Sequence, residues 1–117
     1  MSKPRISIEE FNKIEVSIGT VLSAERVPDT EKLLRLMVDF NEDPPAGGGP
    51  RQIISGIAVY VPEPESLVGR QLAFVTNLEP RTIRGFESNG MIFAVGEGDT
   101  FAFVTSDRPV PSGTSAH

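Results

Sequence analysis

The sequence contains no cysteine and no tryptophan, and its only histidine is the last residue, His117. Without cysteine the chain has no disulfide, no thiolate metal site and no thiol nucleophile. A single terminal histidine argues against histidine-based catalysis. No nucleophile stands in a recognisable spacing with a base, and no glycine-rich phosphate loop with its lysine is present. We therefore expect no catalytic activity, no metal site and no cofactor.

Long apolar runs are also missing. No window approaches the length of a membrane span, and the opening MSKPRISIEEF has no apolar signal-peptide core. These features predict a cytoplasmic protein without a membrane partner. The 117 residues, 38% hydrophobic and 23% charged, are typical of one globular domain, so we expect a single domain over 1–117.

Positive charge is scarce, because the formal net charge is -5. Such a chain is not a generally cationic DNA-binding protein, since that affinity comes mainly from neutralising phosphates. The charge is uneven along the chain. Residues 51–84 carry 4 basic and 3 acidic side chains, whereas each flank has a net charge of -3. Any nucleic-acid contact is therefore expected to be local.

The pattern of residues predicts mainly β-structure. Ser7 and Glu10 form a capping-box signature for a short opening helix, and Gly69 closes a helical turn within 62–70. Alternation and β-rich composition predict strands at 14–27, 32–40, 51–61, 71–78, 91–96 and 99–105. Gly19 interrupts the first strand as a bulge or bend would. Residues 41–50, with three prolines and three glycines, form a loop, and 107–114 form an extended tail.

Five or six strands with one short helix between the third and fourth favour an all-β, five-stranded Greek-key barrel of the OB-fold type, with an extra C-terminal strand segment. An immunoglobulin-like sandwich is the structural competitor. That fold needs about seven strands and has no helical insert.

Basic residues gather on the second to fourth predicted strands and the turn that follows them. They are Lys32, Arg35, Arg51, Arg81 and Arg84. Closure of a barrel brings several onto one wall, where Asn77, Ser55 and Ser88 add uncharged donors for phosphates and sugars. Ordinary solvated arginines produce the same spacing, so the alternative stays open.

The turn GFESNG, residues 85–90, needs a positive φ, which its Gly, Asn and Ser residues adopt readily. Four phenylalanines on predicted strands are candidates for base stacking, although aromatic residues on barrel strands more often fill the core. They are Phe74, Phe93, Phe101 and Phe103. Phe86 differs from them because it lies in a glycine-flanked loop.

Four motifs occur in a recognisable order: DTEKLLRLMVDF, RQIISGIA, VTNLEPRTIRGFESNGMIFA and PVPSGT. Together, from about 11 to 114, they resemble the tRNA-binding domain family. This module is appended to many methionyl-tRNA synthetases and also occurs as free-standing dimeric tRNA-binding proteins. The KLL and SGIA blocks resemble the synthetase appendages more than the related CsaA secretion chaperones.

The resemblance implies an OB-fold that binds tRNA by shape and backbone without chemistry of its own. It also implies a homodimer, and a link to a methionyl-tRNA synthetase that acts in trans. The binding positions that it implies are Lys32, Arg35, Arg51, Ser55, Asn77, Arg81, Arg84, Ser88 and Met91. The departures are the loop 41–50, which adds Glu42 and Asp43 beside this face, and the acidic net charge.

The alternative function is a protein-interaction or chaperone-like dimer that uses the same barrel without physiological RNA binding. The acidic balance and Phe86 favour that interpretation. In either case the apolar tail 101–114, together with the ISIEEF segment, is expected to pack against a second copy, unless the tail closes its own barrel.

Overall fold

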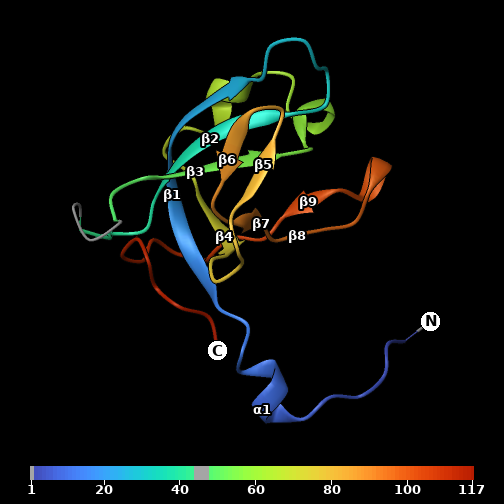
Figure 1. The fold of residues 1–117 in the computed structure, drawn as a ribbon, viewed down its shortest axis with the longest axis vertical. Helices are drawn as coiled ribbons and strands as arrows, with labels where there is room; N and C mark the ends of the chain where they lie inside the picture. The colour runs from blue at the N-terminus through green and yellow to red at the C-terminus, as the bar shows by residue number, and fades with distance from the viewer. Residues whose placement is uncertain (1, 44–47) are drawn as a thin grey trace.

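The computed structural model describes residues 2–43 and 48–117. Its centre is a five-stranded antiparallel sheet in the order β3-β2-β1-β4-β7, curled into a nearly closed barrel (Figure 1). The strands are β1 (Val16–Arg26), β2 (Leu34–Asp39), β3 (Arg51–Ser55), β4 (Gln71–Val75) and β7 (Met91–Ile92). The edge strands β3 and β7 approach each other where the Asn89 N–H donates to the Gln52 carbonyl at 2.8 Å. The predicted all-β, OB-like barrel is confirmed.

Two small hairpins and several short helices make up the other regular elements of the described residues. The hairpins pair β5 (Arg81–Ile83) with β6 (Phe86–Ser88), and β8 (Ala94–Val95) with β9 (Ala102–Phe103). The helices are α1 (Ile8–Phe11) and the 3-10 turns η1 (Ala58–Tyr60), η2 (Pro64–Leu67) and η3 (Gly98–Thr100). Among the described residues, no helix has the length and apolar character needed to cross a membrane.

Several predicted strands are shorter than expected. The third ends at Ser55 rather than at 61, because the chain turns into η1 and the Ala58 N–H donates to the Lys32 carbonyl. The predicted strand 91–96 is divided between β7 and β8, and 99–105 begins with η3. Apolar composition gave no sign of these turns. The predicted loop 41–50 contains residues 44–47, which lie outside the described part of the chain.

The first strand is bulged, but not at Gly19. Its register with β2 shifts between Val21 and Ser23. Gly19 instead lies in the regular part of the strand, where a Cβ would collide with Val38 Cγ1 and approach Phe40 Cε1 to 2.6 Å. The prediction was wrong because a glycine that makes room for a neighbour looks like a bulge in sequence.

The core follows the predicted alternation of β2, since Leu34, Leu36 and Val38 are completely buried. Phe74 is also completely buried and packs edge-on against Phe40, with ring centroids 5.5 Å apart. The four strand phenylalanines do not behave alike. Phe101 and Phe103 are partly buried against the core, whereas Phe93 is 45% exposed.

The two termini have different relations to the barrel. The capping box of α1 is confirmed, and α1 lies below the barrel in Figure 1, with its side chains exposed. The tail, by contrast, pairs with β1 of its own chain. The Ile18 N–H donates to the Thr114 carbonyl at 2.8 Å, and the Gly113 N–H donates to the Ile18 carbonyl at 2.7 Å. The last residues therefore extend the barrel wall.

Candidate nucleic-acid interface

The hairpin of β5 and β6 carries both Arg81 and Arg84. It lies against β3 (Figure 1) and turns at Arg84 and Gly85, whose φ angles are 53° and 84°. Two successive positive φ angles match the turn that best fits the twist of a two-residue hairpin. The turn predicted over 85–90 is therefore right in part. Gly85 and Gly90 have the expected positive φ angles, but residues 86–88 form β6, and the hairpin turn already begins at Arg84.

Ser88 fixes this hairpin to the barrel. It is buried, its Oγ accepts the Ile54 N–H at 2.9 Å, and its hydroxyl donates to the Gly90 carbonyl at 3.2 Å. Gly90 lies so close to β3 that a Cβ there would be 3.1 Å from Ile53 Cδ1. Ser88 thus points inward, and its hydroxyl is used within the protein.

Arg81 and Arg84 are both exposed to solvent, although Arg81 lies directly across from Ser88 in the hairpin register. Within 2–43 and 48–117, neither arginine has an ion-pair partner. Arg81 lines a small cavity of about 70 Å³ together with Met91, which is 48% exposed. The structure therefore brings Arg81 and Met91 together, while Arg84 lies at the turn of the same hairpin. Lys32 is exposed in the turn before β2.

Arg35 lies on the outer face of β2 and is partly engaged. Its Nη1 donates to Glu25 Oε1 at 2.6 Å, and its Nε donates to Gln52 Oε1 at 2.6 Å. The guanidinium stands 5.6 Å from the ring centre of Phe86, within the range of a cation–π contact. This contact explains why an apolar side chain occupies the glycine-flanked segment: Phe86 is half-buried beneath Arg35.

Arg51 is the most fully engaged of the predicted cations. Its Nε and Nη2 donate to the two oxygens of Glu42 at 2.8 and 2.7 Å, and its Nη1 donates to the Thr76 carbonyl at 2.7 Å. The hydrogen bond from Arg51 lowers the pKa of the Glu42 carboxyl below its ordinary value of 4.5, against the opposing effect of burial. The same hydrogen bond raises the pKa of Arg51.

Two other predicted positions serve the fold. The Asn77 amide donates to the Lys13 carbonyl at 2.6 Å and accepts the Glu15 N–H at 2.9 Å, so it holds the segment that enters β1. Ser55 is buried at the end of β3. The nine predicted positions are therefore not one surface: some face solvent and others hold the surface in place.

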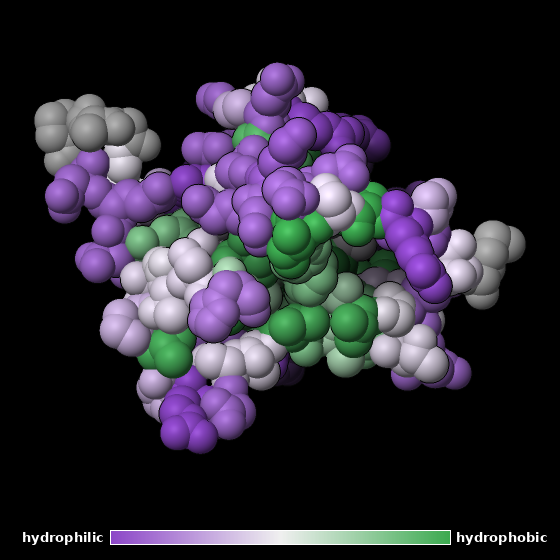
Figure 2. Space-filling model, turned by 90° about the horizontal axis from the view of Figure 1, so that it is seen from below, coloured by the Kyte–Doolittle hydropathy of each residue, from purple (hydrophilic) through white to green (hydrophobic). Residues whose placement is uncertain are grey.

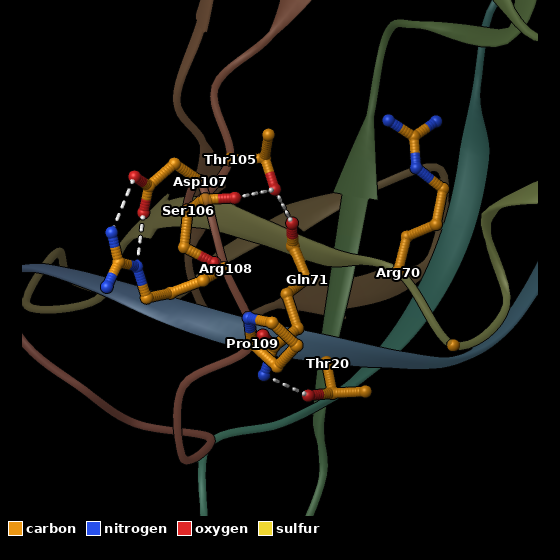
Figure 3. Close-up of a pocket in the computed structure, with 9 residues that line it drawn as sticks. Thr20, Arg70, Gln71, Thr105, Ser106, Asp107, Arg108 and Pro109 are labelled. Atoms are coloured by element: carbon orange, nitrogen blue, oxygen red, sulfur yellow. Dashed lines mark hydrogen bonds and ion pairs between the residues drawn. The ribbon is translucent and has the colours of Figure 1, made fainter.

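A separate polar pocket of about 450 Å³ lies between β1, the start of β4 and the tail, and contains none of the predicted positions (Figure 3). Arg70 and Arg108 stand on opposite sides of it. Arg108 pairs with Asp107 at 3.2 Å, and Arg70 stands 5.2 Å from the ring centre of Phe103. Sequence reasoning did not single out this pocket, because its residues come from distant, unpatterned positions.

An apolar surface lies on the lower side of the molecule, where Figure 2 shows hydrophobic residues gathered around a hollow. A groove of about 420 Å³ is lined there by residues of the N-terminal segment, the chain after β7 and the tail. The apolar ones are Phe11, Ile14, Val16, Phe93 and Ala116. Phe11, Ile14 and Phe93 are each about half exposed, which is unusual for side chains of this size.

The chain matches the family model described as "Putative tRNA binding domain" over residues 16–115. It is 49% identical over 111 residues to the methionine–tRNA ligase of Methanospirillum hungatei, a match that covers 95% of this chain and 15% of that protein. The chain thus spans about 15% of the length of the curated relative it matches.

Solved structures agree in fold. A protein from Pyrococcus horikoshii described as related to MetRS has a TM-score of 0.84 and 34% identity, covering 98% of this chain and 100% of that one. The chaperone CsaA of Bacillus anthracis has a TM-score of 0.80 and 28% identity, with 97% and 100% covered. The chain belongs to the tRNA-binding domain family.

Proposed function

We propose that the chain binds tRNA through the β5–β6 hairpin, which lies against β3. The observation that carries the proposal is the pair of exposed arginines, Arg81 and Arg84, which lack a carboxylate partner in the described residues. Cations without an internal partner are available to phosphate oxygens, and arginine suits phosphates through its paired donors. The proposed binding involves no catalytic step.

The other predicted positions support this surface in different ways. We propose that Lys32 and Met91 also contact tRNA, since both are exposed. The polarizable side chain of Met91 is suited to an unstacked base or a ribose. Arg35 presents a partly exposed guanidinium over Phe86. Because phosphate contacts position a nucleic acid and carry no sequence information, we expect recognition of tRNA shape.

A binding titration with total tRNA tests the proposal, with the double variant R81A/R84A compared with R70A/R108A. Both variants remove two positive charges, but the second pair lies at the separate polar pocket. We expect R81A/R84A to weaken binding by about 1 to 3 kcal/mol and the control to have little effect. Equal losses in the two variants would show that net charge, not the hairpin, determines affinity.

We further propose that the chain forms a homodimer through the apolar surface around Phe11, Ile14 and Phe93. Burying this groove against a second copy removes half-exposed apolar side chains from water. The tail residues that pair with β1 leave the groove open between them and the N-terminal segment. Two barrels also offer tRNA a wider surface than one, which offsets the weak field of an acidic chain.

Light scattering at micromolar concentration tests the homodimer. We expect a dimer mass for the wild type and a monomer mass for F11S/F93S. The control is V59S/V68S, which replaces two exposed apolar side chains that do not line the groove. A shortened chain that ends at Gly98 tests the tail, provided that circular dichroism shows that it keeps its β-structure, because the removed residues also pair with β1. A folded shortened chain that remains dimeric would refute a role of the tail in the interface. A monomeric wild type would contradict the dimer.

The same apolar surface favours a second candidate function, a chaperone-like dimer that binds unfolded chains. One structural neighbour is described as a chaperone, which supports this alternative. Two assays on F11S/F93S and R81A/R84A distinguish the functions: tRNA affinity and the suppression of protein aggregation. If the chain is a chaperone, F11S/F93S should no longer suppress the aggregation of an unfolded protein, whereas R81A/R84A should still suppress it. If R81A/R84A leaves tRNA affinity unchanged and F11S/F93S abolishes suppression, the chaperone-like function is favoured.

Finally, we propose that the chain assists a methionyl-tRNA synthetase in trans, in the cytoplasm. The 49% identity to part of a methionine–tRNA ligase supports this link. Added to a synthetase that lacks such a domain, the chain should lower the KM for tRNA, because it supplies additional tRNA contacts, and R81A/R84A should not. An unchanged KM with the wild-type chain would contradict the assistance.

A further inference from the structure

Arg51 lies where three segments of the chain meet. It begins β3, its partner Glu42 follows β2, and its Nη1 reaches the Thr76 carbonyl just after β4. The same nitrogen lies 3.5 Å from the Asn89 carbonyl, in the turn between β6 and β7. One guanidinium thus spans β3, the end of β4 and the base of the β5–β6 hairpin.

The guanidinium has little capacity left for an external phosphate. Glu42 occupies Nε and Nη2 in a bidentate pair, and Nη1 is directed at two carbonyls. The Arg51 side chain is only 16% exposed, and the Phe40 ring centre lies 5.3 Å from its Cζ. Four of the five N–H donors of Arg51 are therefore directed at protein oxygens, so a phosphate that takes both Nε and Nη2 must first displace Glu42.

The groups that Arg51 meets are those that set the position of the hairpin. Asn89 also donates its N–H to the Gln52 carbonyl, and Gly90 stands close enough to β4 that a Cβ would be 3.4 Å from the Val75 carbonyl. The turn therefore fits between β3 and β4. Moving its base moves Arg81, which pairs with Ser88 in the hairpin register.

We propose that Arg51 and Glu42 are positioning residues for tRNA binding: they hold the base of the hairpin against the barrel so that Arg81 and Arg84 meet phosphates in fixed places. Arg51 acts through the hairpin and does not contact tRNA. Glu42 is then a support for binding, although it adds a negative charge beside the binding surface. This inference rests on the proposed tRNA binding.

The direction in which removal of the Glu42 carboxylate changes tRNA affinity distinguishes two roles for Glu42: positioning the hairpin, or competing with phosphate for Arg51. If Glu42 only shields Arg51 from phosphate, E42A frees a cation and strengthens tRNA binding. If it positions the hairpin, E42A weakens binding, by roughly tenfold. The matched control is D43A, which removes the same charge from the next residue, whose side chain is exposed. We expect D43A to bind tRNA as the wild type does or slightly better.

The test is a titration of total tRNA with wild type, E42A, E42Q and D43A, below the melting temperature of each variant. The positioning role is supported if E42A loses tRNA affinity, E42Q loses less of it, and D43A keeps the wild-type affinity. Affinity of E42A equal to or above that of D43A would overturn it. A wild type that binds no tRNA would instead refute the proposed function.

A second measurement uses additivity. In the R81A/R84A background, R51A should cause little further loss, because the contacts through which it acts are already absent. Full additivity would overturn the proposal, since it identifies Arg51 as an independent contact. Should R51A fail to fold, E42A in the same background gives the same comparison.

Discussion

The arginines around the proposed interface occupy two regions with opposite properties. On the barrel itself, Arg35 and Arg51 are each paired with a carboxylate, at 2.6 and 2.7 Å. On the β5–β6 hairpin, Arg81 at the base and Arg84 at the turn are exposed, and the described residues offer them no such partner. The same residue type therefore has two roles. Counting basic residues does not locate a binding surface, whereas the partner of each guanidinium does.

The largest difference that we expect between the two regions is in stability. R51A leaves Glu42 and the Thr76 carbonyl without their donor, so it should lower the free energy of unfolding by about 2 to 3 kcal/mol. R81A removes an exposed side chain and should change it by less than about 0.5 kcal/mol. Urea unfolding of both variants measures the difference, and equal midpoints would remove the distinction between the regions.

Ser88 sharpens the comparison because it belongs to the hairpin but faces the barrel. S88A leaves the Ile54 N–H without its acceptor in a buried place and should lower the free energy of unfolding by about 1 to 2 kcal/mol. S66A, on the exposed surface of η2, is the control. If S88A and S66A have the same free energy of unfolding, the Ser88 hydroxyl does not fix the hairpin to the barrel.

Acid should weaken the ion pair between Arg51 and Glu42. The pKa of Glu42 is lowered in the folded protein by Arg51, which Glu15 also faces electrostatically. Its pairing therefore stabilises the fold above the ordinary pKa of 4.5, and this contribution is lost as the pH falls through the lowered pKa. The gap in unfolding free energy between wild type and E42Q should narrow over that range. A gap independent of pH would mean that the ion pair contributes nothing.

The smallest effect concerns the turn itself. Arg84 has a φ of 53°, which asparagine adopts more readily than arginine. R84N should therefore raise the free energy of unfolding by about 0.5 to 1 kcal/mol, by relief of backbone strain, while it weakens tRNA binding. Thermal melting and a tRNA titration on the same sample measure both. A variant that is less stable would show that the Arg84 side chain supports the hairpin.

The sequence was sufficient to predict features that depend on residues close together in the chain. The alternation of Leu34, Leu36 and Val38 gave the inner face of β2, and Ser7 with Glu10 gave the cap of α1. It did not predict the β5–β6 hairpin, because an Arg-Gly turn lacks the usual Asn-Gly signal. Nor did it predict that Arg51 pairs with Glu42, since the pairing depends on how the end of β2 packs against β3.

For the candidate site, the sequence indicated the residues but not their roles. Ser88 and Asn77 have side chains that suit phosphates or sugars, yet their hydrogen bonds go to the Ile54 N–H and the Lys13 carbonyl. Only the packed structure shows which polar groups remain unsatisfied, because every buried donor and acceptor must find a partner first.

The most direct test of the account is the salt dependence of tRNA binding by wild type and R81A/R84A. If both arginines contact phosphates, log affinity should fall linearly with log salt, and the double variant should have a slope smaller by about 1.4 to 1.8. R70A/R108A should keep the wild-type slope. A wild-type slope near zero, or an unchanged slope in R81A/R84A, would contradict the claim that the hairpin arginines bind the tRNA backbone.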